Sequence, residues 1–478
     1  MIAPVLNQTD ERQLKRLLWL VAVGFFMQTL DATIVNTALP AMAEGLNESP
    51  LRMQSVLVAY SLTMALLIPL SGWLADRFGT RRMFLGAILV FVAGSLACGL
   101  AVTLNQLVAA RVLQGAGGAL LMPVGRLTVL RAYPRERFLG AMSFVAIPGL
   151  VGPLLGPTLG GWLVEIASWH WVFLVNVPVG ALGWIAARRY LPDFRGVERN
   201  RLDVPGYGLL ALGMALVLLS VDGLSALGLH GATSLVVLVT GLACLAAYWL
   251  RAGRQAHPLF PPSLFRVPAL SIGLTGNLIS RLGSSAVPFL IPLMLQLSLG
   301  YSPAQAGMMM LPMALAGMLI KRFATWSITR YGYRRVLVIN TACVGGMIAS
   351  FALISGTEPV WLLVLQFYLF GSCNSLQFTA MNTLTLRDLD TAQASSGNSL
   401  LSMVQMLAMS LGVALAAAVL GGFAETLQAE ADPARMQQAF RYTFICMGGM
   451  TLASAWVFWQ LSPHSVWVRR LEQDPGFD

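Results

Sequence analysis

The stretch Gly72-Trp-Leu-Ala-Asp76-Arg77-Phe-Gly79-Thr-Arg81-Arg82 decides the fold of this chain. It is one of the few hydrophilic gaps in an otherwise apolar sequence of 478 residues, and a long apolar segment lies on each side of it. Short basic turns of this kind connect membrane helices on the cytoplasmic side. The stretch therefore predicts a membrane protein.

The same turn recurs in the second half of the chain. Its pattern Arg77-x-Gly79-x-Arg81-Arg82 returns as Arg330-x-Gly332-x-Arg334-Arg335 with the same internal spacing, although Thr329 stands where the first copy has Asp76. A repeat this far apart indicates two related halves of a transporter rather than a solenoid. The alternative is a chance match between two loops that both follow the positive-inside rule.

The composition excludes a soluble globular protein. Hydrophobic residues make up 56% of the chain and charged residues only 11%, whereas soluble domains have about 25% charged residues. The first apolar segment, residues 17–40, is too long for a signal peptide and has no convincing cleavage site. We expect it to remain as the first membrane helix.

Segments of about 20 apolar residues, long enough to cross a bilayer, predict fourteen membrane helices. Their approximate spans are 17–40, 53–74, 83–102, 106–130, 138–165, 171–190, 204–221, 233–252, 268–297, 303–325, 336–355, 360–385, 394–423 and 439–461. Twelve helices is the main alternative, because the two segments between 204 and 252 are the weakest. The predicted fold is an all-α integral membrane protein with two six-helix bundles related by a pseudo-two-fold axis and two extra linker helices.

Polar, proline-containing gaps on either side of the extra helix pair set the predicted domain boundaries. These are an N-terminal bundle over 1–190, a linker with two helices over 191–266 and a C-terminal bundle over 267–478.

The basic residues are distributed asymmetrically. With an inside amino terminus, most of the 31 Lys and Arg residues fall in inner loops and tails, and the outer loops hold only Arg52, Arg435 and Arg441. This asymmetry predicts that both termini lie on the inner side of the membrane. It also explains the net charge of +10 without nucleic-acid binding.

The expected partners are a small-molecule substrate, protons and the lipid bilayer, and we expect a monomer.

Four further stretches resemble motifs of one transporter family. They are Leu30-Asp31-Ala-Thr-Ile34-Val35-Asn36-Thr-Ala38-Leu39-Pro40, Arg111-Val-Leu-Gln114-Gly115-Ala-Gly117-Gly118-Ala119, Gly149-Leu-Val-Gly152-Pro153-Leu-Leu-Gly156-Pro157-Thr-Leu-Gly160-Gly161 and Trp169-His170-Trp171-Val-Phe173-Leu-Val-Asn176-Val-Pro178-Val-Gly180. In this order they resemble the fourteen-helix drug/proton antiporters of the major facilitator superfamily, the EmrB and QacA type. The basic turn resembles the loop between the second and third helices of that superfamily. The resemblance implies proton-driven, multidrug-type efflux by alternating access.

The predicted fifth helix is rich in glycine and proline. It contains Gly152, Pro153, Gly156, Pro157, Gly160 and Gly161, in the stretch that resembles the antiporter motif. Such a helix can bend and pack closely against a partner helix across the interface between the halves. Ordinary small-residue packing with no role in antiport is the alternative.

The basic turn and its neighbours form the candidate gating loop: Gly72, Asp76, Arg77, Gly79, Arg81, Arg82 and Arg137. Gly72 would let helices approach, and Asp76 would pair with an arginine such as Arg77 or Arg137. We interpret this group as a conformational latch at the inner gate. A plain topology signal is the alternative, but it does not explain the acid.

Asp31 is the candidate proton-coupling residue, and Arg111 is its candidate partner. Asp31 lies about 14 residues into the first helix, roughly 21 Å into a core about 30 Å thick. Arg111 enters from the outer side to a similar depth. A carboxylate there tends to take up a proton, whereas a nearby guanidinium favours the ionised form. The alternative is a static buried ion pair.

The predicted substrate cavity combines further charges and amides. Arg281 lies as deep in the first helix of the second half as Asp31 does in the first half, and we expect it to face the central cleft. Arg126, Lys321 and Arg322 either face the cleft or snorkel to the lipid headgroups. The other predicted cavity residues are Gln28, Asn36, Gln114, Asn277, Asn374 and Gln377. One deep acid with at least two deep bases suits an anionic or zwitterionic substrate better than a lipophilic cation.

No enzymatic site is evident in the sequence. It has no nucleotide-binding loop and no catalytic constellation, and its five cysteines are scattered in apolar segments, so we expect no metal, cofactor or disulfide. The predicted function is proton-coupled export of small molecules. An exporter of an organic anion, such as a carboxylate metabolite or its metal complex, is one alternative, and proton-coupled uptake or a facilitator is another.

Overall fold

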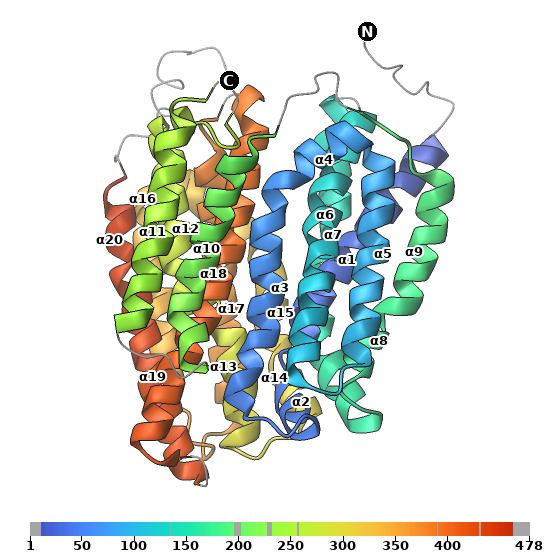
Figure 1. Cartoon of the computed structure of the whole chain (residues 1–478). Coiled ribbons are helices and arrows are strands. Elements are labelled where there is room, and N and C mark those ends of the chain that lie inside the picture. The colour runs from blue at the N-terminus through green and yellow to red at the C-terminus, as the bar shows by residue number, and fades with distance from the viewer. Residues whose placement is uncertain are drawn as a thin grey trace.

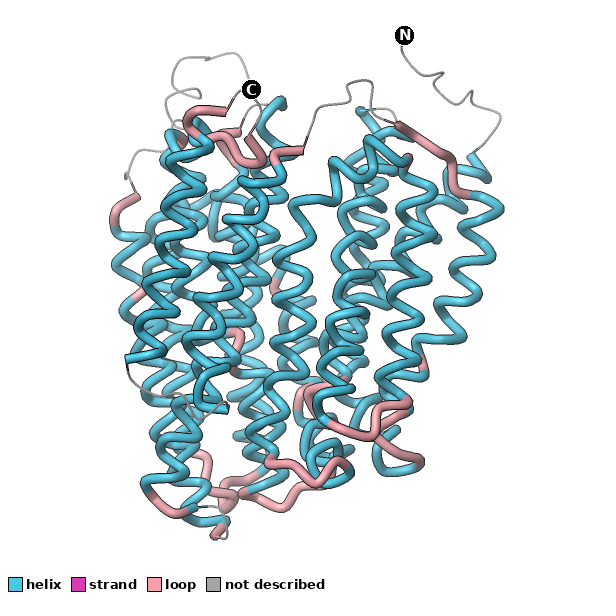
Figure 2. The backbone as a smooth tube through the Cα atoms, in the orientation of Figure 1, coloured by secondary structure: helices cyan, strands magenta, loops and turns pink. Residues whose placement is uncertain are grey.

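The structure is a computed structural model that describes residues 11–133, 135–195, 202–226, 232–255, 258–389, 391–429 and 432–461. Within these ranges the chain forms helices joined by short connections, and no strand occurs among them (Figure 2). The predicted all-α membrane fold is confirmed.

We refer to the helices up to Tyr190 as the N-terminal half. They are α1 (Glu11–Ile34), α2 (Leu39–Gly45), α3 (Gln54–Leu67), α4 (Ser71–Phe78), α5 (Thr80–Gly99), α6 (Leu104–Ala132), α7 (Arg135–Ile166), α8 (Trp171–Leu174) and α9 (Asn176–Tyr190), with 3₁₀ turns at Pro50–Met53 and Ile68–Leu70.

We refer to the helices from Pro268 onward as the C-terminal half. They are α12 (Pro268–Ser284), α13 (Val287–Leu297), α14 (Pro303–Met309), α15 (Leu311–Leu319), α16 (Lys321–Ser350), α17 (Val360–Leu386), α18 (Thr391–Thr426), α19 (Pro433–Ala453) and α20 (Ala455–Trp459). Short 3₁₀ helices span Pro262–Arg266 and Phe351–Leu353.

In the sequence, the two halves are connected through α10 (Val204–Ala226) and α11 (Ala232–Ala252), which pack against each other. Figure 1 shows this pair in green beside the C-terminal half, where α10 contacts α18. The residue boundaries of the three predicted domains stay a prediction.

Eleven spans in the described part of the chain are long and apolar enough to cross a membrane. The other three predicted segments, 138–165, 303–325 and 360–385, are helical as α7, α14 with α15, and α17. The count of fourteen crossings therefore remains a prediction. The first segment differs from the prediction because α1 ends at Ile34 and α2 begins at Leu39. Pro40, which has no N–H, cannot continue the hydrogen-bond ladder of α1.

The two basic turns share one backbone conformation. Gly79 has φ 92° and ψ 145°, and Gly332 has φ 77° and ψ 160°, inside a run that is otherwise helical. This region of φ favours glycine because it has no Cβ. The turns are therefore single-residue breaks between helices, shorter than the loop that the sequence suggests, and Arg81 and Arg82 already belong to α5.

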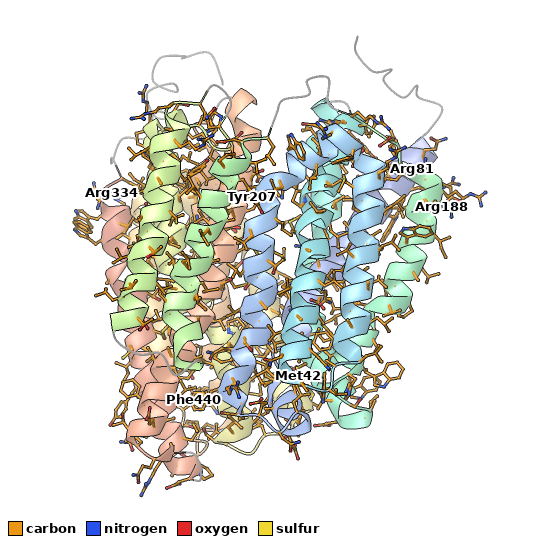
Figure 3. All side chains as sticks on the ribbon, in the orientation of Figure 1. Met42, Arg81, Arg188, Tyr207, Arg334 and Phe440 are labelled. Atoms are coloured by element: carbon orange, nitrogen blue, oxygen red, sulfur yellow. The ribbon has the colours of Figure 1, made fainter. Side chains whose placement is uncertain are left out.

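The two ends of the helix bundle differ in chemistry. Arg81 and Arg188 lie near one end of the bundle, whereas Met42 and Phe440 lie toward the opposite end (Figures 1 and 3). We call these the basic end and the far end. By the positive-inside rule, the basic end is expected to face the cytoplasm.

One apolar cluster joins the two halves at the far end. It contains Val35, Leu39 and Met42 of the N-terminal half together with Phe289, Leu293 and Phe440 of the C-terminal half, all fully or almost fully buried. Toward the basic end the buried side chains form separate clusters, one in the N-terminal half and two that draw on the C-terminal half. We call the shared cluster the far-end seal, since it closes that side of the interface.

Candidate functional site

Asp31 lies on α1 with its side chain fully buried. Three donors reach its carboxylate: Arg111 Nη1 at 2.7 Å from Oδ2, Gln114 Nε2 at 2.7 Å from Oδ1, and Asn176 Nδ2 at 2.9 Å from Oδ1. They come from α6 and α9, so three helices meet at this group. A buried carboxylate is costly unless it is paired and hydrogen-bonded. The three donors meet that requirement, and a proton bound at Asp31 would remove the charge that they hold.

Arg111 is buried as well, with 1% of its side chain exposed. Besides Asp31, its Nε donates to the carbonyl of Val56 at 3.2 Å, and its guanidinium lies over the ring of Tyr60, 4.1 Å from the centroid. A guanidinium over an aromatic face is attracted by the ring quadrupole. Arg111 is thus fixed between α1 and α3, and it also contributes to the wall of the central cavity.

Two members of this network were not predicted from the sequence. Asn176 begins α9 and donates to Asp31, and Ser95 on α5 accepts from Gln114 Nε2 at 2.6 Å. Asn176 belongs to the motif over residues 169–180. A polar amide in this apolar segment could have marked it as a functional residue. Ser95 gave no such signal, because serine is common in membrane helices as a packing residue.

A cavity of about 210 Å³ lies between the halves. Both halves contribute to it, and its lining includes Asn36, Tyr60, Ser61, Arg111, Arg281, Ser284, Phe289, Asn374 and Phe378. The volume falls below the roughly 300 Å³ at which drug-sized ligand sites begin. In this conformation the cavity fits a small organic molecule, and a larger one would require it to widen.

Arg281 lies on α12 in the wall of this cavity. Its guanidinium lies over the ring of Phe378, 4.8 Å from the centroid, and its Nε donates to Asn277 Oδ1 at 3.3 Å. Among the described side chains no carboxylate forms an ion pair with it. Lys321, which does not line the cavity, approaches the same ring, with Nζ 5.9 Å from the centroid. The positive charge of the C-terminal wall therefore comes from Arg281, whereas the acid of the N-terminal half is enclosed by its own donors.

The structure divides the predicted cavity residues into two groups. Asn36, Arg281 and Asn374 line the cavity, as does Arg111, the predicted partner of Asp31, whereas Gln28, Gln114, Asn277 and Gln377 do not line it. All four of the latter are buried inside their own halves. Gln114 is held by Asp31 and Ser95, Asn277 donates to Gly273, Gln377 joins Asn340 to Thr341, and Gln28 lies beside Met64. Interhelical hydrogen bonds satisfy most of these amides without water.

The other intramembrane bases lie apart from the cavity. Arg126 Nη1 donates to Asn398 Oδ1 at 2.7 Å and so links α6 to α18 across the halves. Lys321 Nζ lies 3.4 Å from Thr379 Oγ1, and Arg322 is exposed on the outer surface of α16.

The glycines of α7 pack mainly against α1. A Cβ at Gly152, Gly156 or Gly160 would collide with atoms of residues 29–34 of α1 and of Thr37 just after it, including backbone atoms of Leu30 and Ile34. Thr37 Oγ1 also donates to the carbonyl of Pro157 at 3.0 Å. The expected contact with the opposite half exists at the far end of α7, where Gly161 lies against the backbone of Pro303. Pro153 remains part of the predicted motif. The glycines of α7 therefore allow close packing mainly against α1, the helix that contains Asp31, and less against the opposite half.

Asp76 pairs with Arg131 near the end of α6. It does not pair with Arg77, which lies over the ring of Trp73 instead, 5.5 Å from the centroid. Adjacent residues on a helix point in different directions, which explains the difference. The side chain of Arg137, the other predicted partner, lies outside the described residues.

Arg81 of the basic turn is held by the end of α9 and by the segment that follows it. Arg81 donates its backbone N–H to Asp193 Oδ1 at 3.2 Å and its side chain to the carbonyl of Arg188, while Arg82 is exposed. The expectation for Gly72 is wrong, because a Cβ there would meet no atom within 4 Å. Gly72 is exposed on α4 and brings no helix closer.

Residues 21–413 match the family model described as "Major Facilitator Superfamily". The chain belongs to the major facilitator superfamily. As a member of this superfamily it is a multi-pass membrane transporter of small molecules rather than an enzyme.

Similar bacterial proteins extend over nearly the whole transporter. A protein of Serratia proteamaculans, described as "Putative multidrug resistance protein MdtD", is 48% identical over 96% of this chain and 96% of its own length. Proteins with the same description in Pectobacterium atrosepticum and Salmonella typhi are 47% and 49% identical, over 94% and 92% of this chain and 96% and 93% of their own. The sequence resembles MdtD in Met27-Gln28, in Met122-Pro123-Val-Gly125-Arg126-Leu-Thr128 and in Ser395–Met403. The family resemblance predicted from the sequence is confirmed.

Solved transporter structures share the fold of this superfamily transporter. A POT family transporter in complex with 5-aminolevulinic acid gives a TM-score of 0.67 at 15% identity, covering 95% of this chain and 96% of its own. The human organic anion transporter MFSD10 gives 0.61 at 16% identity, covering 93% and 99%. Identities this low establish the fold alone.

The Asp76→Ala variant of the transporter is expected to shift its conformational equilibrium while leaving substrate affinity unchanged. The variant removes the partner of Arg131, and a half-exposed pair contributes up to about 1 kcal/mol, which is a factor of about five in a two-state ratio. Spin-label distance distributions across the halves would measure the ratio. Asp388→Ala, which removes an exposed carboxylate from the other half, is the matched control. A fall in affinity with unchanged distance distributions would refute the latch.

Proposed function

We propose that this transporter is a proton-coupled exporter of small organic molecules that works by alternating access in a bacterial inner membrane, with both termini in the cytoplasm. The observation behind the proposal is the buried carboxylate of Asp31, held by Arg111, Gln114 and Asn176. Arg111 lies both at this carboxylate and in the cavity wall. A charge change at Asp31 would therefore reach the substrate site through a single side chain.

The coupling follows from electrostatics. While Asp31 is ionised, its pair with Arg111 is satisfied and α1, α6 and α9 are held together. A proton on Asp31 neutralises the carboxylate and leaves the guanidinium of Arg111 as an uncompensated charge at the cavity wall. That state is relieved by rearrangement of the helices or by an anionic group in the cavity. Proton binding thus favours one conformation over the other, as exchange requires.

The relatives support export of multiple drugs as the direction and substrate class. Proteins close to half identical over nearly their whole length are described as multidrug resistance proteins. The far-end seal supports alternating access, because one end of the interface between the halves is closed by a contiguous apolar cluster.

The test is substrate accumulation in inverted membrane vesicles under an imposed pH gradient. We expect accumulation of exported compounds when the vesicle interior is acidic, and its loss when a protonophore collapses the gradient. Vesicles from cells without the protein are the control. Equilibration of the substrate without accumulation, unaffected by the pH gradient, would establish a facilitator. Release driven by the gradient would establish uptake, and either result would replace the proposal.

A second candidate is export of an organic anion. The observation that favours it is Arg281, which lines the cavity beside Asn374 and has no carboxylate partner among the described residues. A partly buried cation without a carboxylate partner is costly to hold in the membrane. A substrate carboxylate in the cavity would supply the missing charge.

The Arg281→Ala variant is expected to weaken transport of organic carboxylates by on the order of 1.5–3 kcal/mol, about tenfold to more than a hundredfold, because a hydrogen bond to a charged group is lost. Arg281→Lys should retain part of the activity. The measurement is initial transport rate against carboxylate concentration in the same vesicles. Arg322→Ala removes an exposed charge from the same half and is the matched control. Equal transport of cationic dyes by wild type and Arg281→Ala, with no carboxylate transported by either, would refute the anion candidate.

A further inference from the structure

The two copies of the basic turn have the same backbone but different surroundings. At Gly79 a Cβ would collide with the carboxylate of Asp193, so the first turn is covered by an acid from the segment after α9. At Gly332 a Cβ would meet no atom within 4 Å. The second turn is therefore open where the first is closed.

Two acids lie beside the first copy. Asp76 pairs with Arg131, and Asp193 pairs with Arg195 and accepts from the backbone N–H of Arg81. The covering segment is fixed by a hydrogen bond from Thr80 N to the carbonyl of Phe194 at 2.9 Å. Two carboxylates thus serve this basic turn.

The second copy has no such acid. Thr329 replaces the aspartate, and Arg334 and Arg335 form no ion pair with any side chain that the structure describes. Arg334 lies over the ring of Trp459 instead, 5.0 Å from the centroid. Arg387, a further base beside this turn, is already paired with Asp388 through two hydrogen bonds. Arg330 of the turn also has no ion pair among the described side chains, so three unpaired positive charges remain, of which Arg334 and Arg335 lie at the groove.

These charges border a groove of about 700 Å³ on the C-terminal half. Its lining consists of Tyr331, Gly332, Tyr333, Arg334, Arg335, Val338, Ile339, Leu384, Arg387, Trp459 and Leu461. Val338 and Ile339 lie one helical turn, about 6 Å, beyond the two arginines along α16. Ile339 is 64% exposed and Trp459 60% exposed, as expected for side chains that meet lipid and its interface. The groove thus has a basic rim above an apolar wall.

We propose that this groove binds an anionic phospholipid, whose phosphate lies at Arg334 and Arg335 and whose acyl chains lie along Val338 and Ile339. Basic pockets beside membrane helices are suited to such headgroups. The headgroup supplies from the membrane the negative charge that Asp76 and Asp193 supply to the first copy. A free phosphate would satisfy the arginines but would leave the apolar wall uncovered, so the amphipathic lining favours a lipid.

The experiment is native mass spectrometry of the full chain in detergent with equal amounts of phosphatidylglycerol and phosphatidylethanolamine. We expect the wild type to retain phosphatidylglycerol in preference. The Arg334→Gln/Arg335→Gln variant should bind it on the order of tenfold more weakly, because two charges near the headgroup are lost. The control, Arg254→Gln/Arg266→Gln, removes two exposed arginines from the connection between α11 and α12 and should bind it like the wild type.

A second variant keeps the test decisive if the double variant unfolds. Trp459→Ala removes the ring beneath Arg334 and part of the groove wall but no charge, and it should weaken phosphatidylglycerol binding severalfold. Three results would overturn the proposal: equal loss of binding in the variant and the control, no preference between the two lipids, or displacement of the lipid from wild type by millimolar inorganic phosphate. The last would assign the arginines to a free anion.

Discussion

Asp31→Asn is expected to insert and fold, and to lose export driven by a pH gradient down to the level of vesicles without the protein. The amide keeps the shape of the carboxylate and can still accept from Gln114 and Asn176, but it cannot bind and release a proton. It also resembles the protonated state, which the transporter must visit if the proposal holds. The fold should therefore tolerate it, at a loss of stability because Arg111 is left buried without its charge partner.

Two measurements separate coupling from general damage. Gradient-driven accumulation in inverted vesicles should vanish, whereas substrate exchange without a gradient should continue. Asp432→Asn is the matched control, since this exposed aspartate caps α19 and asparagine is an equally good cap. Full gradient-driven transport by Asp31→Asn would remove Asp31 from the mechanism.

Arg111→Ala is expected to destabilise the transporter by about 3–5 kcal/mol, because it leaves a buried carboxylate without its charge partner. The variant also loses the hydrogen bond to Val56 and the contact with the ring of Tyr60. Unfolding by denaturant in detergent, followed by helix content, would measure the loss. Arg322→Ala, on the exposed surface of α16, should leave stability unchanged within about 0.5 kcal/mol.

The double variant Asp31→Asn/Arg111→Ala shows whether charge is the cause. In the double variant neither buried charge is present, so no ion is left without a partner. Its free energy of unfolding should therefore be higher than the sum of the two single losses predicts. A coupling of at least about 1 kcal/mol is expected for two residues in direct contact. Strictly additive losses would mean that Arg111 acts by packing rather than by its charge.

The sequence predicted positions along helices better than directions around them. The rise of 1.5 Å per residue was enough to assign Asp31 and Arg111 a common depth in the membrane. In the structure Arg111 Nη1 lies 2.7 Å from Asp31 Oδ2. It does not determine which way a side chain points. That is why Gln114 and Gln377 were expected in the cavity although they lie inside their own halves.

Partners from distant segments were the least predictable. Asp76 meets Arg131 because the end of α6 lies beside α4, and Asn176 reaches Asp31 because α9 packs against α1. Neither neighbour follows from local spacing. The repeat of the basic turn was predictable, since each copy needs a residue with positive φ and has a glycine there, Gly79 in the first and Gly332 in the second.

The far-end seal gives the opening of that side a thermal signature. Separation of the halves there would hydrate buried side chains such as Phe289 and Leu293 of one half and Met42 of the other. Hydration of apolar surface is accompanied by a large positive change in heat capacity. If this opening limits turnover, the logarithm of the transport rate plotted against reciprocal temperature should be curved, whereas a rate limited by proton transfer at Asp31 should give a nearly straight line.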